Sequence, residues 1–494
     1  MMPQASPLTE HVTRQAASPI GPPSSTAIGT PAGPRALAEN ASVARPASSG
    51  VLLALFFLVI LLPINPVLGT LRLTPSRIYL IILFIPFAWR LASGKAGRLT
   101  WVDGGMLAFA ILVVATLLYH HGTEELPYGL SQVIEMFGGY MTGRLLVRNL
   151  SDYRRFIRYF LIALLIILPL AIYELFNSRM FVADLFRPYV GVIKKNVEFR
   201  FELSRVQVVF PHSILYGLFC SLALASVYYI YRSRFFRMTL GVALVFATAL
   251  MSLSSAPMIS LLLQTTMVVW DRITRGSWKL LTAIVAFIYV LLQLFTNRGA
   301  LVIFIETMTL DPVTGWWRIH IWTWGTRTVM AYPLLGIGLN DWERPSWLTA
   351  SVDNFWLLIA MSYGLPCLMF ILMAIALHMT FILRARNLPP EARMIRTGYM
   401  ITLVGLIFTL STVDIWDAMS IFVFFFFGAG AFLYTADLTP VEAPIAASPA
   451  ANRDSGPQFS RFPQTAGPAR YKTKLRGTER TTALAPPPTK VPPR

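Results

Sequence analysis

The apolar run DNFWLLIAMSYGLPCLMFILMAIALHMTFILR extends from Asp353 to Arg384. About 20 mostly apolar residues cross the hydrocarbon core of a bilayer as a helix, so this run is too long for one helix perpendicular to the membrane. Gly364, Leu365 and Pro366 interrupt the run, and sharp helix kinks occur at such residues. We therefore predict a membrane helix that is kinked or broken at this point.

The composition of the whole chain agrees with a membrane protein. Hydrophobic residues make up 55% of the 494 residues and charged residues only 13%, whereas about a quarter of a soluble domain is charged. The net charge of +18 is concentrated in the tails and short loops, as membrane orientation requires, so we expect no nucleic-acid partner. Cys220 and Cys367 lie far apart in apolar runs and are interpreted as packing residues.

About twelve segments satisfy the length and composition of a membrane span, which predicts an all-α integral membrane protein. The fourth is the weakest, because Glu135, Arg144 and the pair Gly138 and Gly139 interrupt it. The twelve segments are 51–69, 77–92, 103–119, 128–147, 155–176, 208–231, 235–254, 256–272, 277–296, 353–383, 397–413 and 418–436.

Two tails flank the predicted membrane domain, which covers 51–436. Residues 1–50 are rich in Ala, Ser, Pro and Thr, and residues 437–494 are rich in Pro and basic residues. Such segments cannot bury enough apolar surface to fold, so both are expected to be disordered. Loops rich in Lys and Arg alternate with loops poor in them along the chain, and basic loops are cytoplasmic. Both termini are therefore predicted to be cytoplasmic.

The same alternation places two longer intervals, 177–207 and 297–352, on the outer side of the membrane. The second is a large loop between the ninth and tenth predicted helices. Basic residues are normally sparse on this side, and a polyanion such as a lipid-linked diphosphate would account for them. The basic residues in question are Arg179, Lys194, Lys195, Arg200, Arg205, Arg318, Arg327 and Arg344.

Aromatic and histidine side chains near these loops have two interpretations each. Trp316, Trp317, Trp322 and Trp324 form either an interfacial belt or a platform on which sugars stack. Arg205 is either a snorkelling anchor or a functional cation. The pair His120 and His121 has no third ligand nearby in sequence, so we predict no metal site.

Several motifs together resemble a known family, the O-antigen ligase and O-antigen polymerase superfamily of bacterial inner membranes. The resemblance covers roughly 50–434 and rests on EMFGGYMTGR at 135–144, RVQVVFPHSILYG at 205–217, SLSSAP at 252–257, and WWRIHIWTWGTRTVMAYPLLGIG followed by SVDNFWLLIAMSYGLP. The residues that match the long-loop pattern of this family are Arg318, Trp324, Pro333, Gly336, Gly338, Asn354 and Gly364. In two places the chain departs from it: Asp353 stands where the family has histidine, and SLSSAP lacks the family's arginine.

The resemblance implies transfer of a glycan from an undecaprenyl-diphosphate carrier to a sugar hydroxyl, on a growing polymer or on a lipid A core. Arginines offer the leaving diphosphate a permanently charged, bidentate partner, and no metal or other cofactor is expected. The predicted catalytic residue is Asp353, with Glu174 as second candidate. The predicted diphosphate-binding residues are Arg205, Arg318, Arg200 and Arg327, and the predicted acceptor or sugar contacts are His212, Trp324 and Asn354.

Other interpretations remain open at the level of sequence. Asp353 could instead be the N-cap of the helix that follows it, since Asp is a common N-cap. The whole chain could be a transporter without catalysis, because broken membrane helices occur in carriers, or a binding protein for lipid-linked glycan. The long outer loop and the lack of a visible inverted repeat favour the enzyme.

Overall fold

The computed structural model describes residues 48–64, 66–68, 71–95, 97–186, 197–296, 303, 312–436 and 438. Two compact units divide the chain, Met1–Thr439 and Pro440–Arg494, and the described residues belong to the first unit. The predicted tails lie almost wholly outside the described residues, as do Lys194 and Lys195.

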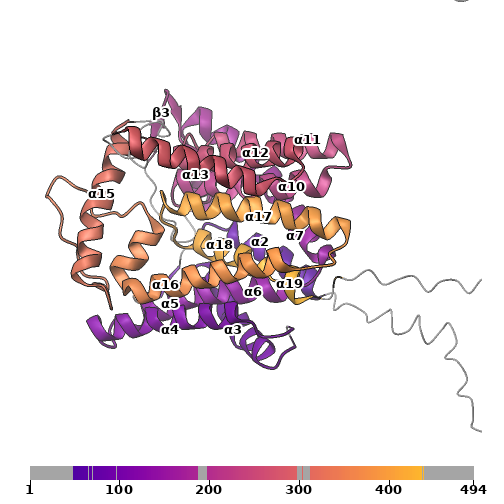
Figure 1. Cartoon of the computed structure of the whole chain (residues 1–494). Coiled ribbons are helices and arrows are strands. Elements are labelled where there is room, and N and C mark those ends of the chain that lie inside the picture. Colours follow the sequence, from indigo (N-terminus) through magenta and orange to yellow (C-terminus); the bar gives the residue numbers. More distant parts are fainter. Residues whose placement is uncertain are drawn as a thin grey trace, which may run out of the picture. The chain divides into compact units, whose positions relative to one another are not determined.

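The first unit is a helical bundle (Figure 1). Its helices in the first half are α2 (Ser48–Ile60), α3 (Pro75–Ala92), α4 (Trp101–His121), α5 (Leu126–Val133), the π-helix η1 (Ile134–Gly138), α6 (Gly139–Leu146), α7 (Leu150–Asn177) and α8 (Phe181–Phe186). Those that follow are α9 (Ser213–Ser221), α10 (Leu224–Tyr231), α11 (Phe235–Leu250), α12 (Ser255–Thr274), α13 (Trp278–Phe295), α15 (Pro312–Ala331), α16 (Phe355–Arg384), α17 (Pro390–Leu410), α18 (Ala418–Ala429) and α19 (Phe432–Thr435). Two antiparallel hairpins pair β1 (Val67–Leu68) with β2 (Leu71–Arg72) and β3 (Phe199–Arg200) with β4 (Leu203–Ser204).

Each of the twelve predicted segments contains helix in the structure. Within the described ranges, eight helical segments are long and apolar enough to cross a bilayer, and α11 is a shorter apolar helix. The chain is therefore an all-α, multi-pass membrane protein, while the count of about twelve spans stays a prediction.

The two predicted outer intervals contain local structure. α15 occupies 20 residues of the interval 297–352, and α8 with the β3–β4 hairpin lies in the interval 177–207. Figure 1 shows α15 at one end of the bundle, whereas the loops that join α10 to α11 and α16 to α17 lie at the other end. The second group of loops is rich in arginine.

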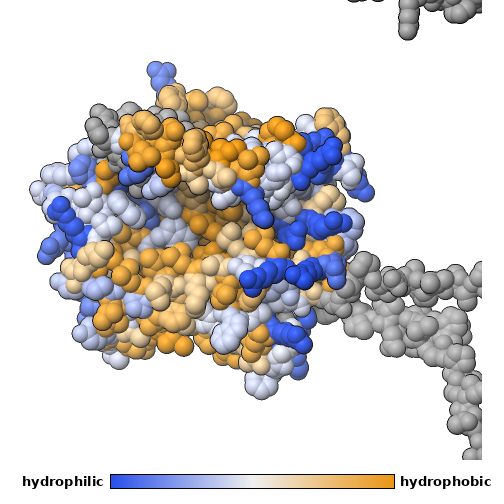
Figure 2. Space-filling view, viewed as in Figure 1, coloured by the Kyte–Doolittle hydropathy of each residue, from blue (hydrophilic) through white to orange (hydrophobic). Residues whose placement is uncertain are grey.

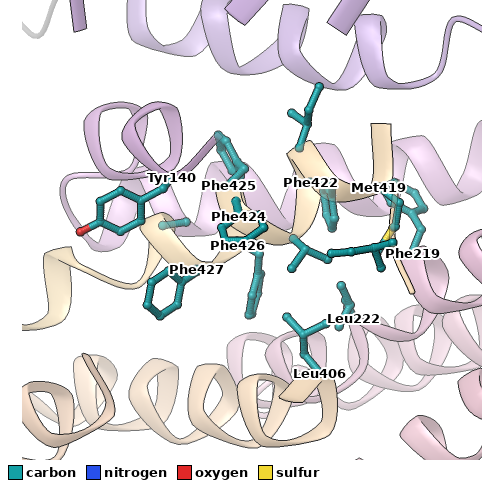
Figure 3. Packing of buried hydrophobic residues seen from close by; sticks show 14 of the residues in the cluster. Tyr140, Phe219, Leu222, Leu406, Met419, Phe422, Phe424, Phe425, Phe426 and Phe427 are labelled. Atoms are coloured by element: carbon teal, nitrogen blue, oxygen red, sulfur yellow. The ribbon is translucent and has the colours of Figure 1, made fainter. Parts of the chain in front are cut away.

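The core of the bundle forms around α18. Its run from Phe422 to Phe427 is buried, and Figure 3 shows these rings surrounded by side chains from neighbouring helices, among them Tyr140 and Leu406. α6 lies very close to α18, because a Cβ built on Gly143 would lie only 2.0 Å from the Phe425 carbonyl oxygen. Small residues of this kind let membrane helices approach each other closely.

The weak fourth segment is helical but irregular. α5 continues into the π-helix η1 and then into α6. Glu135 and Arg144, which dilute the hydropathy of this segment, are 1% and 2% exposed. Arg144 forms an ion pair with Asp103 at 2.8 Å. These two charged residues are thus buried inside the protein and do not face lipid, and the interior is where charged residues of membrane helices are tolerated.

The predicted kink in α16 is confirmed. Gly364 has φ of 85° inside the helix, a conformation that favours glycine. The turn Pro333–Gly338 after α15 packs against this kink, and a Cβ on Gly364 would lie 2.2 Å from the Leu334 carbonyl oxygen. Three backbone hydrogen bonds join the turn to the kink, from Ile337 to Met361 at 2.8 Å, from Gly338 to Ser362 at 2.9 Å and from Leu365 to Pro333 at 2.8 Å.

Both histidines at the end of α4 contact the same turn. The backbone N–H of Leu339 donates to Nε2 of His121 at 2.9 Å, and Nε2 of His120 lies 3.2 Å from the Leu335 carbonyl oxygen. α4 and α16 therefore hold the turn from two sides, which fixes the chain that follows α15.

α13 differs from the other long helices. None of its residues is buried, although its hydropathy is that of a membrane span. Figure 2 shows hydrophobic residues over the face of the molecule on which α13 and α16 lie. A helix that is apolar all round and not covered by protein is suited to contact lipid.

Candidate functional site

Asp353 and Asn354 stand side by side at the start of α16 but have different contacts. Oδ1 of Asn354 accepts a hydrogen bond from the backbone N–H of Leu357 at 3.0 Å, so Asn354 is the N-cap. The interpretation of Asp353 as the N-cap is therefore wrong. Within the described ranges, no hydrogen bond or ion pair engages the Asp353 carboxylate, which lines a cavity.

This cavity, which we name the carboxylate cavity, has a volume of about 490 Å³. The segment after the Pro333–Gly338 turn forms one wall, and α5 and the loop between α17 and α18 form others. Its polar lining residues include Tyr128, Gln132, Asn340, Asp341, Ser351, Asp353, Ser362, Tyr363 and Asp414. A concave site with a few converging polar groups is the usual form of a small-molecule site.

Asp414 is a second carboxylate in this cavity that sequence reasoning missed. The backbone N–H of Phe355 donates to the Val413 carbonyl oxygen at 3.2 Å, which brings the loop 411–417 to the start of α16. The pKa of Asp414 is raised to about 7, mainly by burial and in part by the negative charge of Asp353. The only signal in the sequence was the acidic, lysine-free loop TVDIWD, and nothing local linked that loop to Asp353.

Arg318, which lies on α15, is close to Asp353. Burial lowers the pKa of Arg318, the Asp353 carboxylate raises it, and the positive charge of Arg200 lowers it. The structure thus brings together three residues that are distant in sequence. Nε of Arg318 is buried, and it has no hydrogen-bond partner in the part of the chain that the structure describes. A buried donor without a partner is rare and calls for a ligand or water.

Arg200 lies in β3, and Arg205 directly follows β4. The SLSS segment at the start of α12 contacts both arginines. Nη1 of Arg200 donates to the Leu253 carbonyl oxygen at 2.8 Å, and Nη2 of Arg205 donates to Oγ of Ser254 at 2.8 Å. Arg205 also forms an ion pair with Glu198. The junction that resembles the family motif therefore positions cations here, although it has no arginine of its own.

His212 lies beside Arg205, since both contact Glu198. Its Nδ1 accepts a hydrogen bond from the backbone N–H of Ile214 at 3.1 Å, so that His212 caps α9. Its Nε2 lies 3.6 Å from the Glu198 carboxylate, and hydrogen bonding to His212 is the main reason that the pKa of Glu198 is lowered. The ring of His212 lies 6.4 Å from that of Trp416, which lines the carboxylate cavity.

Glu174 is not a lining residue of the carboxylate cavity. It is 3% exposed, and its two carboxylate oxygens accept hydrogen bonds from the backbone N–H groups of Gln207 at 2.8 Å and Val208 at 2.9 Å. These contacts fasten the chain that follows Arg205 to the end of α7. Glu174 therefore holds the segment beside Arg205, one of three arginines (Arg200, Arg205 and Arg318) that we name the arginine cluster.

Arg327 and Trp324 lie apart from Arg318. Arg327 follows Arg318 by nine positions, which is about two and a half helical turns, so the two arginines project from opposite faces of α15. Cζ of Arg327 lies 4.4 Å from the centroid of the Trp324 ring. Both residues line a second cavity of about 550 Å³, which we name the aromatic pocket.

A third, acidic cavity of about 350 Å³ adjoins the carboxylate cavity, with which it shares Tyr128, Gln132 and Trp416. Arg77 is central to it. Nε of Arg77 donates to Glu135 at 2.5 Å, and Nη2 donates to Asp417 at 3.1 Å. Glu135 stood out in sequence as a charge in an apolar segment, but its partner Arg77 on α3 was not predictable from that signal.

Comparison with models of known protein families finds no match, and no curated protein compared with the chain matches it.

Proposed function

We propose that the chain transfers glycan from an undecaprenyl-diphosphate carrier to a sugar hydroxyl at the periplasmic face of the bacterial inner membrane, as a ligase or polymerase of the O-antigen superfamily that its motifs resemble. The observation that carries the proposal is the position of Asp353. Its carboxylate lines a cavity and also lies near Arg318. The positive charge of Arg200 in turn lowers the pKa of Arg318.

The arginine cluster would bind the diphosphate of the donor. Arg200, Arg205 and Arg318 lie close enough for Arg200 to lower the pKa of both others. The carboxylate of Glu198 offsets the positive charge of Arg205. The charge of Arg200 still repels those of Arg205 and Arg318, and a bound polyanion would relieve this repulsion. The planar guanidinium group matches phosphate oxygens in a bidentate manner. Nε of both Arg205 and Arg318 lacks a partner among the described residues and could donate to such oxygens.

Asp353 would act as the general base for the acceptor. The acceptor hydroxyl oxygen attacks the anomeric carbon of the donor sugar and transfers its proton to the Asp353 carboxylate. The bond between that carbon and the diphosphate breaks, and the diphosphate leaves with the electron pair. Cations placed where negative charge develops lower the barrier of such a step, and a base must lie within about 3 Å of the proton it accepts.

The test compares complementation of a deletion strain by the wild type, Arg318→Lys and Arg237→Lys. Lysine keeps the charge but loses the bidentate fork, so we expect Arg318→Lys to be present in the membrane and to lose at least about 10-fold of the transfer. Arg237 is exposed on α11, and its lysine variant should restore the wild-type pattern.

A glycolipid gel gives the readout. Loss of a polymerase leaves single repeat units on the carrier lipid, whereas loss of a ligase leaves polymer that is not joined to lipid A. A deletion strain with an unchanged glycolipid pattern would contradict the proposal. Full activity of Arg318→Lys would show that transfer does not require the bidentate guanidinium group at this position.

A further inference from the structure

One face of α15 carries a stripe of aromatic and basic side chains. Trp316, His320, Trp324 and Arg327 follow one another at spacings of four, four and three residues, which places them on a common helix face. Arg318 lies on the opposite face. The helix therefore separates the arginine cluster from this stripe.

The aromatic pocket lies at the C-terminal half of the stripe. Its volume is about 550 Å³. The side chains that give it its chemistry are Trp324, Arg327, Tyr332, Asn340, Asp341, Trp342 and Glu343. Trp342 is buried, and its Nε1 donates to the Ala350 carbonyl oxygen at 3.0 Å, which fixes this wall. Tyr332 is 53% exposed, so its ring is accessible at the pocket.

These residue types suit a neutral saccharide. A pyranose ring has apolar C–H faces that pack on aromatic rings, and hydroxyl groups that both donate and accept hydrogen bonds. Arg327 and Asn340 can donate to such hydroxyls, and the carboxylates of Asp341 and Glu343 can accept from them. Two carboxylates in the pocket disfavour a diphosphate, which distinguishes this pocket from the arginine cluster.

The aromatic pocket adjoins the carboxylate cavity. Both are lined by Ile337, Asn340, Asp341 and Trp342, so the segment after the Pro333–Gly338 turn forms a wall that the two cavities share. In the other direction the stripe continues to Trp347, whose ring centroid lies 5.1 Å from both Trp316 and His320. A chain of sugars can follow the stripe and present one end at Asp353.

We propose that the aromatic pocket binds the glycan chain of the acceptor, on the face of α15 opposite Arg318. This inference rests on the proposed function, because it assigns the two faces of α15 to the two substrates. The donor diphosphate occupies the arginine side. The acceptor saccharide extends from Asp353 through the aromatic pocket.

Binding of oligosaccharide to the purified full-length protein in nanodiscs tests the proposal. The probe is a lipid-free oligosaccharide of a few repeat units, released by mild acid from the surface polysaccharide of the producing strain. Saturation-transfer NMR measures its contact with the protein. We expect binding by the wild type and at least about a 10-fold weaker affinity in Arg327→Ala and Tyr332→Ala. Both side chains are exposed, so neither substitution threatens the fold.

Two matched variants separate this proposal from the proposed function. Trp322→Ala removes an exposed tryptophan that does not line the pocket and should bind as the wild type does. Arg318→Lys should bind the oligosaccharide normally while transfer is lost. Wild-type affinity in both Arg327→Ala and Tyr332→Ala, or no binding by the wild type, would overturn the pocket assignment even if transfer is intact. If the wild type binds the oligosaccharide but shows no transfer, the assignment of the pocket is supported and the proposed transferase function is contradicted.

Discussion

Two neighbouring residues differ in role: Asn354 caps α16, and the proposed function makes Asp353 the general base. Because Asn354 provides the cap, Asp353→Asn should leave the helix start intact. An amide has the shape of the carboxylate but is not basic at neutral pH, so we expect this variant to lose transfer without loss of thermal stability. Transfer from purified lipid-linked donor and the Tm in detergent are the two measurements.

The matched control is Asn354→Ala. Removal of an N-cap costs about 1 kcal/mol, so this variant should have a lower Tm and still transfer glycan. Asp353→His should restore part of the activity, with a rate that rises through the imidazole pKa near about 6.5. A fully active Asp353→Asn protein would remove Asp353 as the base and make Asp414 the next candidate.

Most residues of the site were predictable from the sequence, but the helix faces from which they project were not. Arg318, Arg200 and Arg205 were expected together, and the structure brings them together. Arg327 was expected with them, yet it projects from the other face of α15, because a helix through the predicted loop rotates it by about half a turn relative to Arg318. Asp414 was missed, since only a backbone contact between distant segments places it beside Asp353.

At the scale of an element, the loop 411–417 should make stability depend on pH. The pKa of Asp414 is raised from 3.8 to about 7, so between these values the folded protein holds a proton that the unfolded chain has released. Stability therefore falls as the pH rises through this window and is level above it. We expect Asp414→Asn to raise the Tm at pH 8 and to change it little at pH 5.

The control for this loop is Asp341→Asn. Asp341 is exposed and forms an ion pair with Arg344, so its replacement should give no gain in Tm at pH 8. Equal Tm values for the wild type and Asp414→Asn at pH 8 would show that the Asp414 carboxylate is well solvated.

The contact between the Pro333–Gly338 turn and the kink of α16 allows a second prediction at this scale. Gly364→Ala introduces a Cβ 2.2 Å from a carbonyl oxygen at positive φ, which combines strain with overpacking and should cost more than about 2 kcal/mol. The turn also precedes the wall shared by both cavities, so transfer should fall as well. Thermal unfolding in detergent and the transfer assay measure the two effects.

Gly104→Ala provides the comparison. Gly104 lies in α4, and no atom lies within 4 Å of a Cβ built there, so alanine should leave the Tm unchanged or raise it by the gain in helix propensity. A stable and active Gly364→Ala protein would mean that α16 can straighten without disturbing the turn.

The elements themselves were predictable to different degrees. The kink at Gly364 followed from a Gly and a Pro inside an apolar run, which is a local signal. The irregular passage from α5 through η1 to α6 appeared in sequence as a weak span, because its buried charges reduce the hydropathy. The register of α15 against α16 depends on the turn and on two histidines of α4, and no local pattern encodes those contacts.

At the scale of the whole molecule, the distribution of charge predicts the orientation in the membrane. Figure 1 shows the loops between α10 and α11 and between α16 and α17 at the end of the bundle opposite α15. These loops are rich in arginine, and basic loops stay in the cytoplasm. We therefore predict that α15 and the candidate site lie on the outer side of the membrane, which under the proposed function is the periplasmic side.

Labelling of single cysteines tests this orientation. Cys220 and Cys367 are buried, so a maleimide should react with them little in the folded protein. We expect Ser346→Cys, in the segment after α15, to react with a membrane-impermeant maleimide in intact spheroplasts. Ser233→Cys, in the loop between α10 and α11, and Ser455→Cys, in the C-terminal tail, should react only after the membrane is permeabilised. Labelling of Ser233→Cys but not of Ser346→Cys in intact spheroplasts would invert the topology, and it would place Asp353 and the arginine cluster on the side where a periplasmic donor cannot reach them.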